Sequence, residues 1–142
     1  MRIDATKDFK RPRAEVLTRF RSPERVESVL QGMSIATNRT ADVPELAWDC
    51  TMQWRDAPRR FTTRLTEIAP GETMVMTIAS DLADVAIDIE FYDLPDGGCR
   101  VISKAEITAH SMLVRLALQS LRLVRGKAET RLTRLLNALG RP

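Results

Sequence analysis

The spacing of apolar residues changes twice along the chain, and each spacing predicts a different kind of element. The first ten residues alternate between polar and apolar, with Ile3 and Phe9 on one face, which predicts a half-buried strand. Apolar residues at helical spacing follow in two short segments that begin at Pro12 and Pro23, and proline suits the first turn of a helix. Ser22 has a hydroxyl that can cap the second of these helices. A strand followed by two short helices is therefore expected.

Between Gly32 and Ala109 the apolar residues recur at every second position, which is the period of a β-strand. The strongest segment runs from Leu46 to Trp54, where apolar residues such as Trp48 alternate with mostly polar neighbours. The connections between the segments are short, whereas a parallel crossover needs about a dozen residues or more, so an antiparallel meander is expected. Its six strands are predicted at residues 33–39, 46–54, 60–68, 73–80, 84–93 and 99–109.

Residues 111–139 form the longest helical pattern, with one continuous apolar stripe. Ser111 can cap this helix and Gly140 can end it. Gly126 lies inside this predicted helix, where glycine lowers helix stability by about 1 kcal/mol relative to alanine. It is either the site of a bend, a point of close approach to the sheet, or a glycine tolerated on the surface. Because the meander has one apolar face, the helix is expected to cover it. The stripe consists of Leu113, Ala117, Leu121, Val124, Ala128, Leu132, Leu135 and Leu139.

Length and composition limit the class of protein. A chain of 142 residues suits a single domain, and its 44% hydrophobic and 29% charged content excludes collagen-like, low-complexity and largely disordered proteins. No apolar run approaches the roughly 18 residues of a membrane span, and no apolar targeting segment begins the chain, so a cytoplasmic protein is expected. Cys50 and Cys99 lack metal-site spacing, so we expect reduced, partly buried thiols rather than a disulfide.

The charge is uneven along the chain, although the net charge is only +3. Residues 111–142 carry seven basic residues and one acidic residue, a net charge of +6, whereas residues 1–110 carry 15 basic and 18 acidic residues, a net charge of −3. Either this basic helix is attracted to its own domain, or it faces an anionic ligand head group, an acidic partner or a membrane surface. Nucleic acid is not an expected partner, because every strand aromatic except Tyr92 faces away from the outward arginines.

Residues that could perform catalysis are scarce. His110 is the only histidine, and it falls at the boundary between the last strand and the long helix. Asp88 and Glu90 share a strand face, but it is the face opposite Ile87 and Ile89, so both carboxylates are expected in solvent. No nucleophile elbow, phosphate-binding loop or metal motif is present. The sequence therefore assigns no catalytic residue, metal site or cofactor.

Three short motifs, taken with the order of elements, carry a family resemblance: Ser22-Pro23-Glu24-Arg25-Val26, Leu46-Ala47-Trp48 and Asp96-Gly97-Gly98-Cys99-Arg100-Val101. The chain resembles the SRPBCC superfamily, the helix-grip proteins that include START lipid-transfer domains and the birch-pollen-allergen proteins. It looks most like the bacterial polyketide cyclase/dehydrase-like or CoxG-like branch. The resemblance implies an α+β fold, in which a curved antiparallel sheet of about seven strands wraps around a long C-terminal helix. It also implies a cavity between sheet and helix for an apolar ligand.

The residues expected to face this cavity form the candidate ligand site. Bulky aromatic and flexible thioether side chains suit a pocket that accepts varied apolar shapes, so a small hydrophobic molecule, lipid- or polyketide-like, is the expected ligand. The candidates are Trp48, Met52, Trp54, Phe61, Thr63, Met74, Met76, Ile87, Phe91 and Ser103 on the strands, and Leu113, Ala117 and Leu121 on the helix.

Two other functions stay open from the sequence. A polyketide cyclase or dehydrase would have only His110, Thr63 and Ser103 as polar participants, which favours binding over catalysis. An adaptor protein would dock its partner on the outward face of the helix at 111–139. A homodimer is compatible with either function.

Overall fold

The computed structural model describes residues 1–54, 56–121 and 125–142, apart from the side chains of residues 121 and 125. Within these ranges the structure has seven strands and four helices; the strands and the first two helices follow the predicted order, and two helices stand where one C-terminal helix was predicted. The elements are β1 (Arg2–Phe9), α1 (Arg13–Phe20), α2 (Pro23–Gly32), β2 (Ile35–Ala41), β3 (Glu45–Trp54), β4 (Ala57–Ala69), β5 (Thr73–Ser80), β6 (Ala83–Asp93), β7 (Cys99–Ala109), α3 (Met112–Leu121) and α4 (Arg125–Gly140).

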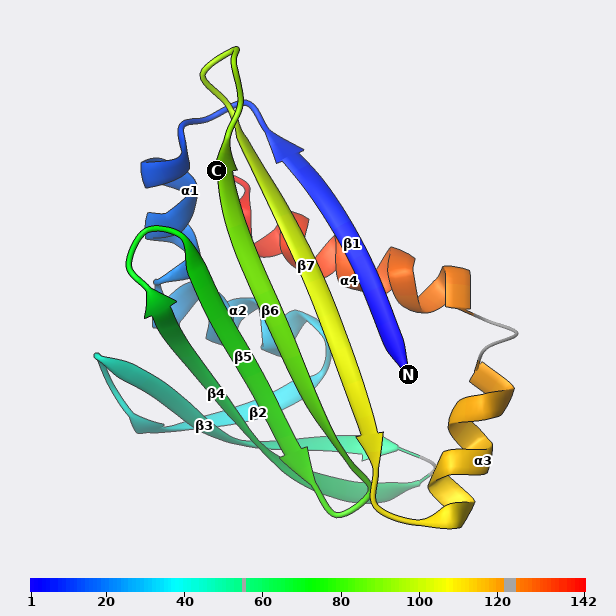
Figure 1. Cartoon of the computed structure of the whole chain (residues 1–142). Coiled ribbons are helices and arrows are strands. Elements are labelled where there is room, and N and C mark those ends of the chain that lie inside the picture. Colours follow the sequence, from blue (N-terminus) through cyan, green and yellow to red (C-terminus); the bar gives the residue numbers. More distant parts are fainter. Residues whose placement is uncertain (55, 122–124) are drawn as a thin grey trace.

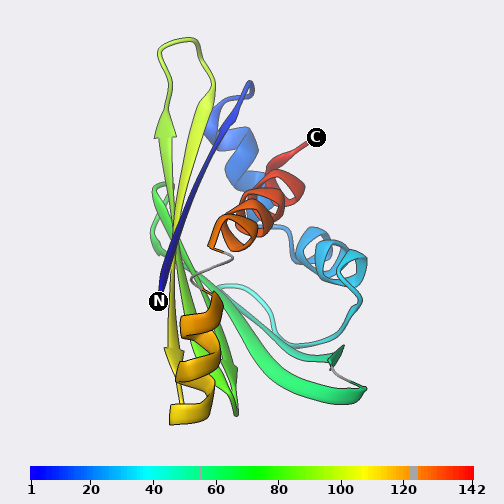
Figure 2. The same ribbon diagram turned by 90° about the vertical axis from the view of Figure 1, so that its right-hand side faces the viewer.

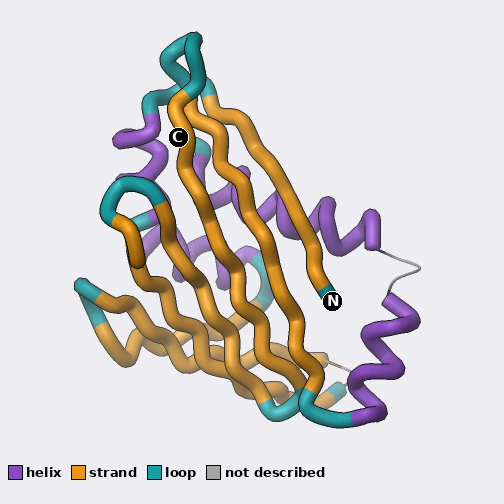
Figure 3. Tube along the Cα trace, in the orientation of Figure 1, coloured by secondary structure: helices purple, strands orange, loops and turns teal. Residues whose placement is uncertain are grey.

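All seven strands belong to one antiparallel sheet in the order β1-β7-β6-β5-β4-β3-β2. The meander from β2 to β7 pairs each strand with the next, and β1 joins the free edge of β7 (Figure 1). Helices α1, α2 and α4 lie on one face of the sheet (Figure 3), and β3 and β4 curve round beneath α2 when the sheet is seen edge-on (Figure 2). The predicted curved sheet of seven strands is confirmed.

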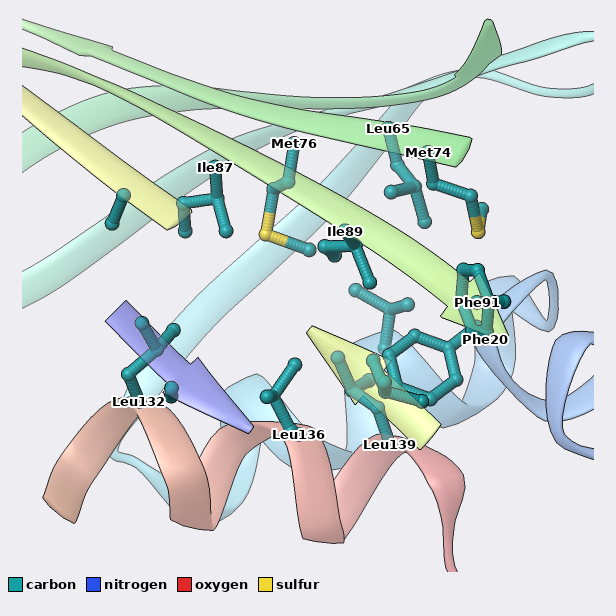
Figure 4. Close-up of a cluster of buried hydrophobic side chains, with 14 of the residues drawn as sticks. Phe20, Leu65, Met74, Met76, Ile87, Ile89, Phe91, Leu132, Leu136 and Leu139 are labelled. Atoms are coloured by element: carbon teal, nitrogen blue, oxygen red, sulfur yellow. The ribbon is translucent and has the colours of Figure 1, made fainter. Parts of the chain in front are cut away.

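The core lies between the sheet and α4. Leu132, Leu136 and Leu139 of α4 point toward the apolar face of the sheet (Figure 4), and all three are buried. The rings of Phe20 from α1 and Phe91 from β6 meet edge to face, with their centroids 5.1 Å apart. Such packing follows directly from the two periods of the sequence, because alternate strand positions and every third or fourth helix position face the same layer.

The C-terminal segment forms two helices, so the prediction of one continuous helix over residues 111–139 is wrong. Helix α3 lies beside the end of the sheet, apart from α4 (Figure 2), and its Met112, Leu113 and Leu116 are 74%, 78% and 57% exposed. Apolar residues spaced three or four residues apart predict a helical backbone locally, but they do not require one unbroken helix. Gly126, the second residue of α4, has nothing within 4 Å of where a Cβ would lie, so it makes no close approach to the sheet.

Two arginines fix the end of α4 against the short helices. Arg19 of α1 donates to the carbonyl oxygen of Gly140 at 2.9 Å, and Arg25 of α2 donates to those of Ala138 and Arg141 at 3.3 and 2.5 Å. These carbonyls lack helical partners because they lie in the last turn or beyond it. The α1–α2 corner therefore holds α4 on the sheet.

The predicted cap at Ser22 is confirmed. Its Oγ accepts a hydrogen bond from the backbone N–H of Arg25 at 3.3 Å, and Pro23 occupies the first position of α2. This cap defines where α2 begins, and α2 in turn provides one wall of the cavity described below.

Candidate ligand cavity

A cavity of about 690 Å³ opens between the sheet, α2 and α4. Its size falls in the range of about 300–1,000 Å³ that is usual for small-molecule sites. Helix α2 contributes Val26, Val29 and Leu30, and α4 contributes Leu135 and Leu139. The apolar faces of two amphipathic helices, about a hundred residues apart in the sequence, therefore form one side of the cavity.

The sheet side of the cavity follows from strand alternation and register. Met52 and Trp54 on β3 share one face, as do Phe61 and Thr63 on β4, and both pairs line the cavity. Strand β5 contributes Met76 from the same face. Because side chains at every second position point to the same side of a sheet, one register supplies all five of these residues.

The mouth of the cavity lies where β3 and β4 extend beyond β5. The last residue of β5, Ser80, pairs with Phe61, so residues 57–60 of β4 continue past the end of β5. The turn after β5, with Asp81 and Leu82, also lines the cavity and follows Ser80 beside this part of β4. This difference in strand length leaves the cavity open at one end.

The interior of the cavity has a single buried polar side chain among the described residues. Thr63 is 1% exposed, and its Oγ1 lies 3.7 Å from Sγ of Cys50. Burial raises the pKa of the Cys50 thiol, so this sulfur is neutral and is a poor nucleophile. The chemistry of the interior therefore favours contact with apolar groups.

Arg59 at the mouth is a residue that the sequence-based prediction missed. It lies on the same face of β4 as Phe61, and its guanidinium carbon is 5.6 Å from the ring centroid of Trp54, in cation–π geometry. The prediction began this strand at residue 60, whereas β4 begins at Ala57. Continuing the alternation two residues back from Phe61 would have placed Arg59 in the site.

The wall formed by α2 was also missed, because the prediction assigned the helical side of the cavity to the C-terminal segment alone. Val26, Val29 and Leu30 were recognised as an apolar stripe, but not as ligand-facing residues. Their spacing was the available signal. A short helix with one apolar stripe has to bury it, and here it partly faces the cavity.

The structure brings together some of the predicted ligand residues and separates others. The five that line the cavity are Met52, Trp54, Phe61, Thr63 and Met76. Those that lie in the packed core, outside the lining, are Trp48, Met74, Ile87, Phe91 and Ser103.

The three predicted helix residues lie on α3 and not beside the cavity lining. Leu113 and Ala117 are exposed to solvent, and the side chain of Leu121 falls outside the described part of the chain. Their expected position over the sheet depended on an unbroken helix. Because α3 is separate from α4, Leu135 and Leu139 of α4 occupy that position instead.

Trp48 is tied to α2 through a carboxylate. Its indole Nε1 donates to Oε2 of Glu27 at 2.8 Å, and Arg39 donates to both carboxylate oxygens of Glu27 at 2.8 Å. The hydrogen bonds from Arg39, and next the one from Trp48, hold the pKa of Glu27 below its ordinary value, and Glu27 in turn raises the pKa of Arg39. This cluster joins the cavity wall α2 to β2 and β3.

The remaining candidates for chemistry lie away from the cavity. His110 Nε2 is 3.0 Å from Oδ1 of Asp84, and both side chains are exposed. The Oγ of Ser103 is buried and has no hydrogen-bond partner among the described residues. Cys50 and Cys99 are both free and buried. In the described ranges no group of three histidine, cysteine or carboxylate side chains is placed to hold a metal ion.

Comparison with known proteins gives matches in structure but not in sequence. No protein-family model and no curated protein matches the sequence. Ara h 8.0201 superimposes with a TM-score of 0.66 at 9% identity, over 99% of this chain and 95% of that one. Truncated norcoclaurine synthase from Thalictrum flavum gives 0.70 at 10%, over 99% and 91%. The di-domain ARO/CYC StfQ of the steffimycin biosynthetic pathway gives 0.62 at 15%, over 99% of this chain and 51% of that one.

These likenesses define the fold. The chain has the α+β helix-grip fold of the SRPBCC, or Bet v 1-like, proteins, as the order of elements in the sequence predicted. In the ranges that the structure describes, no helix is both long and apolar enough to cross a membrane.

Proposed function

We propose that this protein binds a small hydrophobic ligand in the cavity between its sheet, α2 and α4. The observation that carries the proposal is the open cavity of about 690 Å³, whose described interior is apolar apart from Thr63. Burying apolar ligand surface there would gain about 25 cal/mol per Å² before the costs of association. The helix-grip fold supports the proposal, because the same fold occurs in norcoclaurine synthase and in StfQ, whose names indicate work on small organic molecules.

The flexible lining favours a ligand that is recognised by shape and apolarity. Three methionines line the cavity from different parts of the chain: Met33 after α2, Met52 on β3 and Met76 on β5. Methionine side chains adapt to irregular apolar surfaces, so the cavity can accommodate related molecules of different outline. A lipid- or polyketide-like ligand, a cyclase-type activity, the cytoplasmic location and a homodimer stay predictions.

A neutral fluorescent probe tests the proposal. N-phenyl-1-naphthylamine becomes fluorescent in apolar surroundings and carries no charge. Val85 lines the cavity from β6, so Val85→Trp should fill it and weaken probe binding by about tenfold or more. Thr77 on β5 is exposed on the opposite face, so Thr77→Trp adds the same ring outside the cavity and should change the affinity by less than about twofold.

The fold of both variants is checked by circular dichroism and thermal unfolding. Saturable binding by the wild type and by Thr77→Trp, with loss in a folded Val85→Trp, supports the proposal. The absence of saturable binding by the wild type contradicts it, and so does equal binding by all three proteins.

A further inference from the structure

Two arginines at the mouth of the cavity differ from the other arginines of the sheet. Arg2, Arg39, Arg64 and Arg100 lie on strands and each forms a salt bridge with a carboxylate. The strands carry two more arginines, at positions 59 and 60 of β4, and both line the cavity. Among the residues that the structure describes, neither of these two forms a salt bridge. The mouth therefore holds two guanidinium groups that form no salt bridge with any described carboxylate.

Arg59 is the better placed of the two to meet a ligand. Alternation along β4 directs it to the cavity side together with Phe61, whereas Arg60 belongs to the outward register. The ring of Trp54 lies under the Arg59 guanidinium, which leaves the N–H groups at its edge as donors for another partner. A planar guanidinium with free donors suits the oxygens of a carboxylate, sulfonate or phosphate.

The charge balance at the rim also favours an anion. Asp81, in the turn between β5 and β6, is the one acidic residue of the described lining, against Arg59 and Arg60. Asp81 follows Ser80, the partner of Phe61, and so lies nearer to Arg60 of the outward register than to Arg59 of the cavity side. Two guanidinium groups against one carboxylate leave a positive balance for an anionic group. Deeper in the cavity the lining becomes apolar, with Met76 and Ile78.

We propose that the ligand is an anionic amphiphile, whose apolar body fills the cavity and whose acidic head group binds Arg59 at the mouth. The proposal rests on the proposed function, because it requires that the same cavity be the binding site. It adds the chemical class of the ligand and its orientation. A carboxylate, a sulfonate or a phosphate monoester on an apolar body would satisfy it.

A matched pair of probes tests the charge alone. 8-Anilinonaphthalene-1-sulfonate has the ring system of N-phenyl-1-naphthylamine and one additional sulfonate. The wild type should bind the sulfonate more tightly than the neutral probe, by about tenfold at low salt, and the difference should shrink between about 20 and 500 mM NaCl as the ion pair is screened. Laurate and dodecanol, added as competitors of the neutral probe, provide a second matched pair, and laurate should displace the probe at the lower concentration.

Substitutions in β4 locate the effect. Arg59→Gln should weaken binding of the sulfonate about tenfold while changing the neutral probe by less than about twofold, and Arg59→Lys should restore part of the difference. Arg64→Gln removes the same charge from the outward face of the same strand and should leave both affinities unchanged.

The outcomes separate this inference from the proposed function. If the neutral probe binds in the cavity but the sulfonate binds no more tightly, or if Arg59→Gln leaves the sulfonate affinity intact, the anionic class is overturned and the proposed function stands. If Arg64→Gln weakens the sulfonate as much as Arg59→Gln does, the effect is one of net charge and the inference is wrong. If neither probe binds the wild type, the proposed function itself fails.

Discussion

Glu27 shows how a single side chain positions a wall of the cavity. It lies on α2, accepts the indole N–H of the fully buried Trp48, and pairs through both oxygens with Arg39 of β2. An indole donor inside a core needs an acceptor, and a carboxylate held by a guanidinium provides one that stays ionised. The cluster explains how Trp48 can be buried without lining the cavity.

The low pKa of Glu27 predicts a pH-dependent contribution to stability. A carboxyl group whose pKa is lower in the folded state stabilises the fold fully above its unfolded pKa, about 4.3, and loses this contribution as pH falls through the folded value. Glu27→Gln should therefore lower the free energy of unfolding by about 1–2 kcal/mol at pH 7. The difference from the wild type should shrink as pH falls below about 4.3. Urea unfolding at a series of pH values measures it.

Glu45→Gln provides the control for this prediction. Glu45 is exposed and lies 3.9 Å from Arg64, a surface pair worth about 0–1 kcal/mol. Its substitution should have little effect at any pH. A Glu27→Gln protein whose deficit is the same at pH 3 and at pH 7 would show that the ionised carboxylate is not what stabilises the cluster.

Residue-level prediction failed where it depended on an exact boundary. Alternation correctly placed Met52, Phe61 and Thr63 on the inner face of the sheet, because the period of two is a local property of the backbone. It missed Arg59 because the strand was begun three residues too late, and a charged residue gave no reason to extend an apolar pattern. Predictions based on apolar alternation therefore tend to omit functional residues that are charged and lie at the end of a strand.

At the scale of elements, the contact that seats α4 depends on a glycine. The end of α4 lies against β1 and α1, and a Cβ on Gly140 would come within 2.9 Å of the Phe20 ring and closer still to the ring of Phe9. Both rings are buried, so they cannot move aside freely. Gly140 thus ends the helix, as the sequence predicted, and also permits a close approach that the sequence did not reveal.

A pair of glycine substitutions in α4 tests this contact. Gly140→Ala should lower the free energy of unfolding by about 1–3 kcal/mol, as expected for overpacking. Gly126→Ala, at the open beginning of the same helix, should leave the stability unchanged or raise it by up to about 1 kcal/mol. Thermal or urea unfolding compares the two variants. Equal effects would mean that the end of α4 is not closely packed.

The strands could be predicted from the sequence, whereas the arrangement of the C-terminal helices could not. The two-residue alternation of apolar positions recurs in each segment and locates the strands. The short connections between the segments fix their antiparallel pairing. Whether residues 111–139 form one helix or two depends on how each part packs, which periodicity does not encode. The exposed Leu113 of α3 belongs to the same predicted apolar stripe as the buried Leu132 of α4.

At the scale of the whole molecule, the cavity results from elements that are distant in sequence. A short helix near the N-terminus, the last helix and a long hairpin enclose it, so no local motif could have marked it. The basic charge of residues 111–142 indicated either attraction of the C-terminal segment to its own domain or contact with an anionic ligand, an acidic partner or a membrane surface. The cavity side of α4 is instead apolar, with Leu135 and Leu139, and the arginines at the mouth come from β4.

The methyl groups of the methionines report most directly on whether the cavity of this helix-grip fold is the binding site. The chain has six methionines. Those that line the cavity are Met33, Met52 and Met76, and those elsewhere are Met1, Met74 and Met112.

Titration of methyl-¹³C-methionine protein with N-phenyl-1-naphthylamine, followed by two-dimensional NMR, observes all six sites at once. The aromatic rings of the probe shift methyl signals only at close range. We expect progressive, saturable shifts of the three cavity methionines, with much smaller changes at the other three. Shifts confined to the exposed Met112 of α3 would contradict binding in the cavity. The absence of a shift at every methionine would contradict it as well.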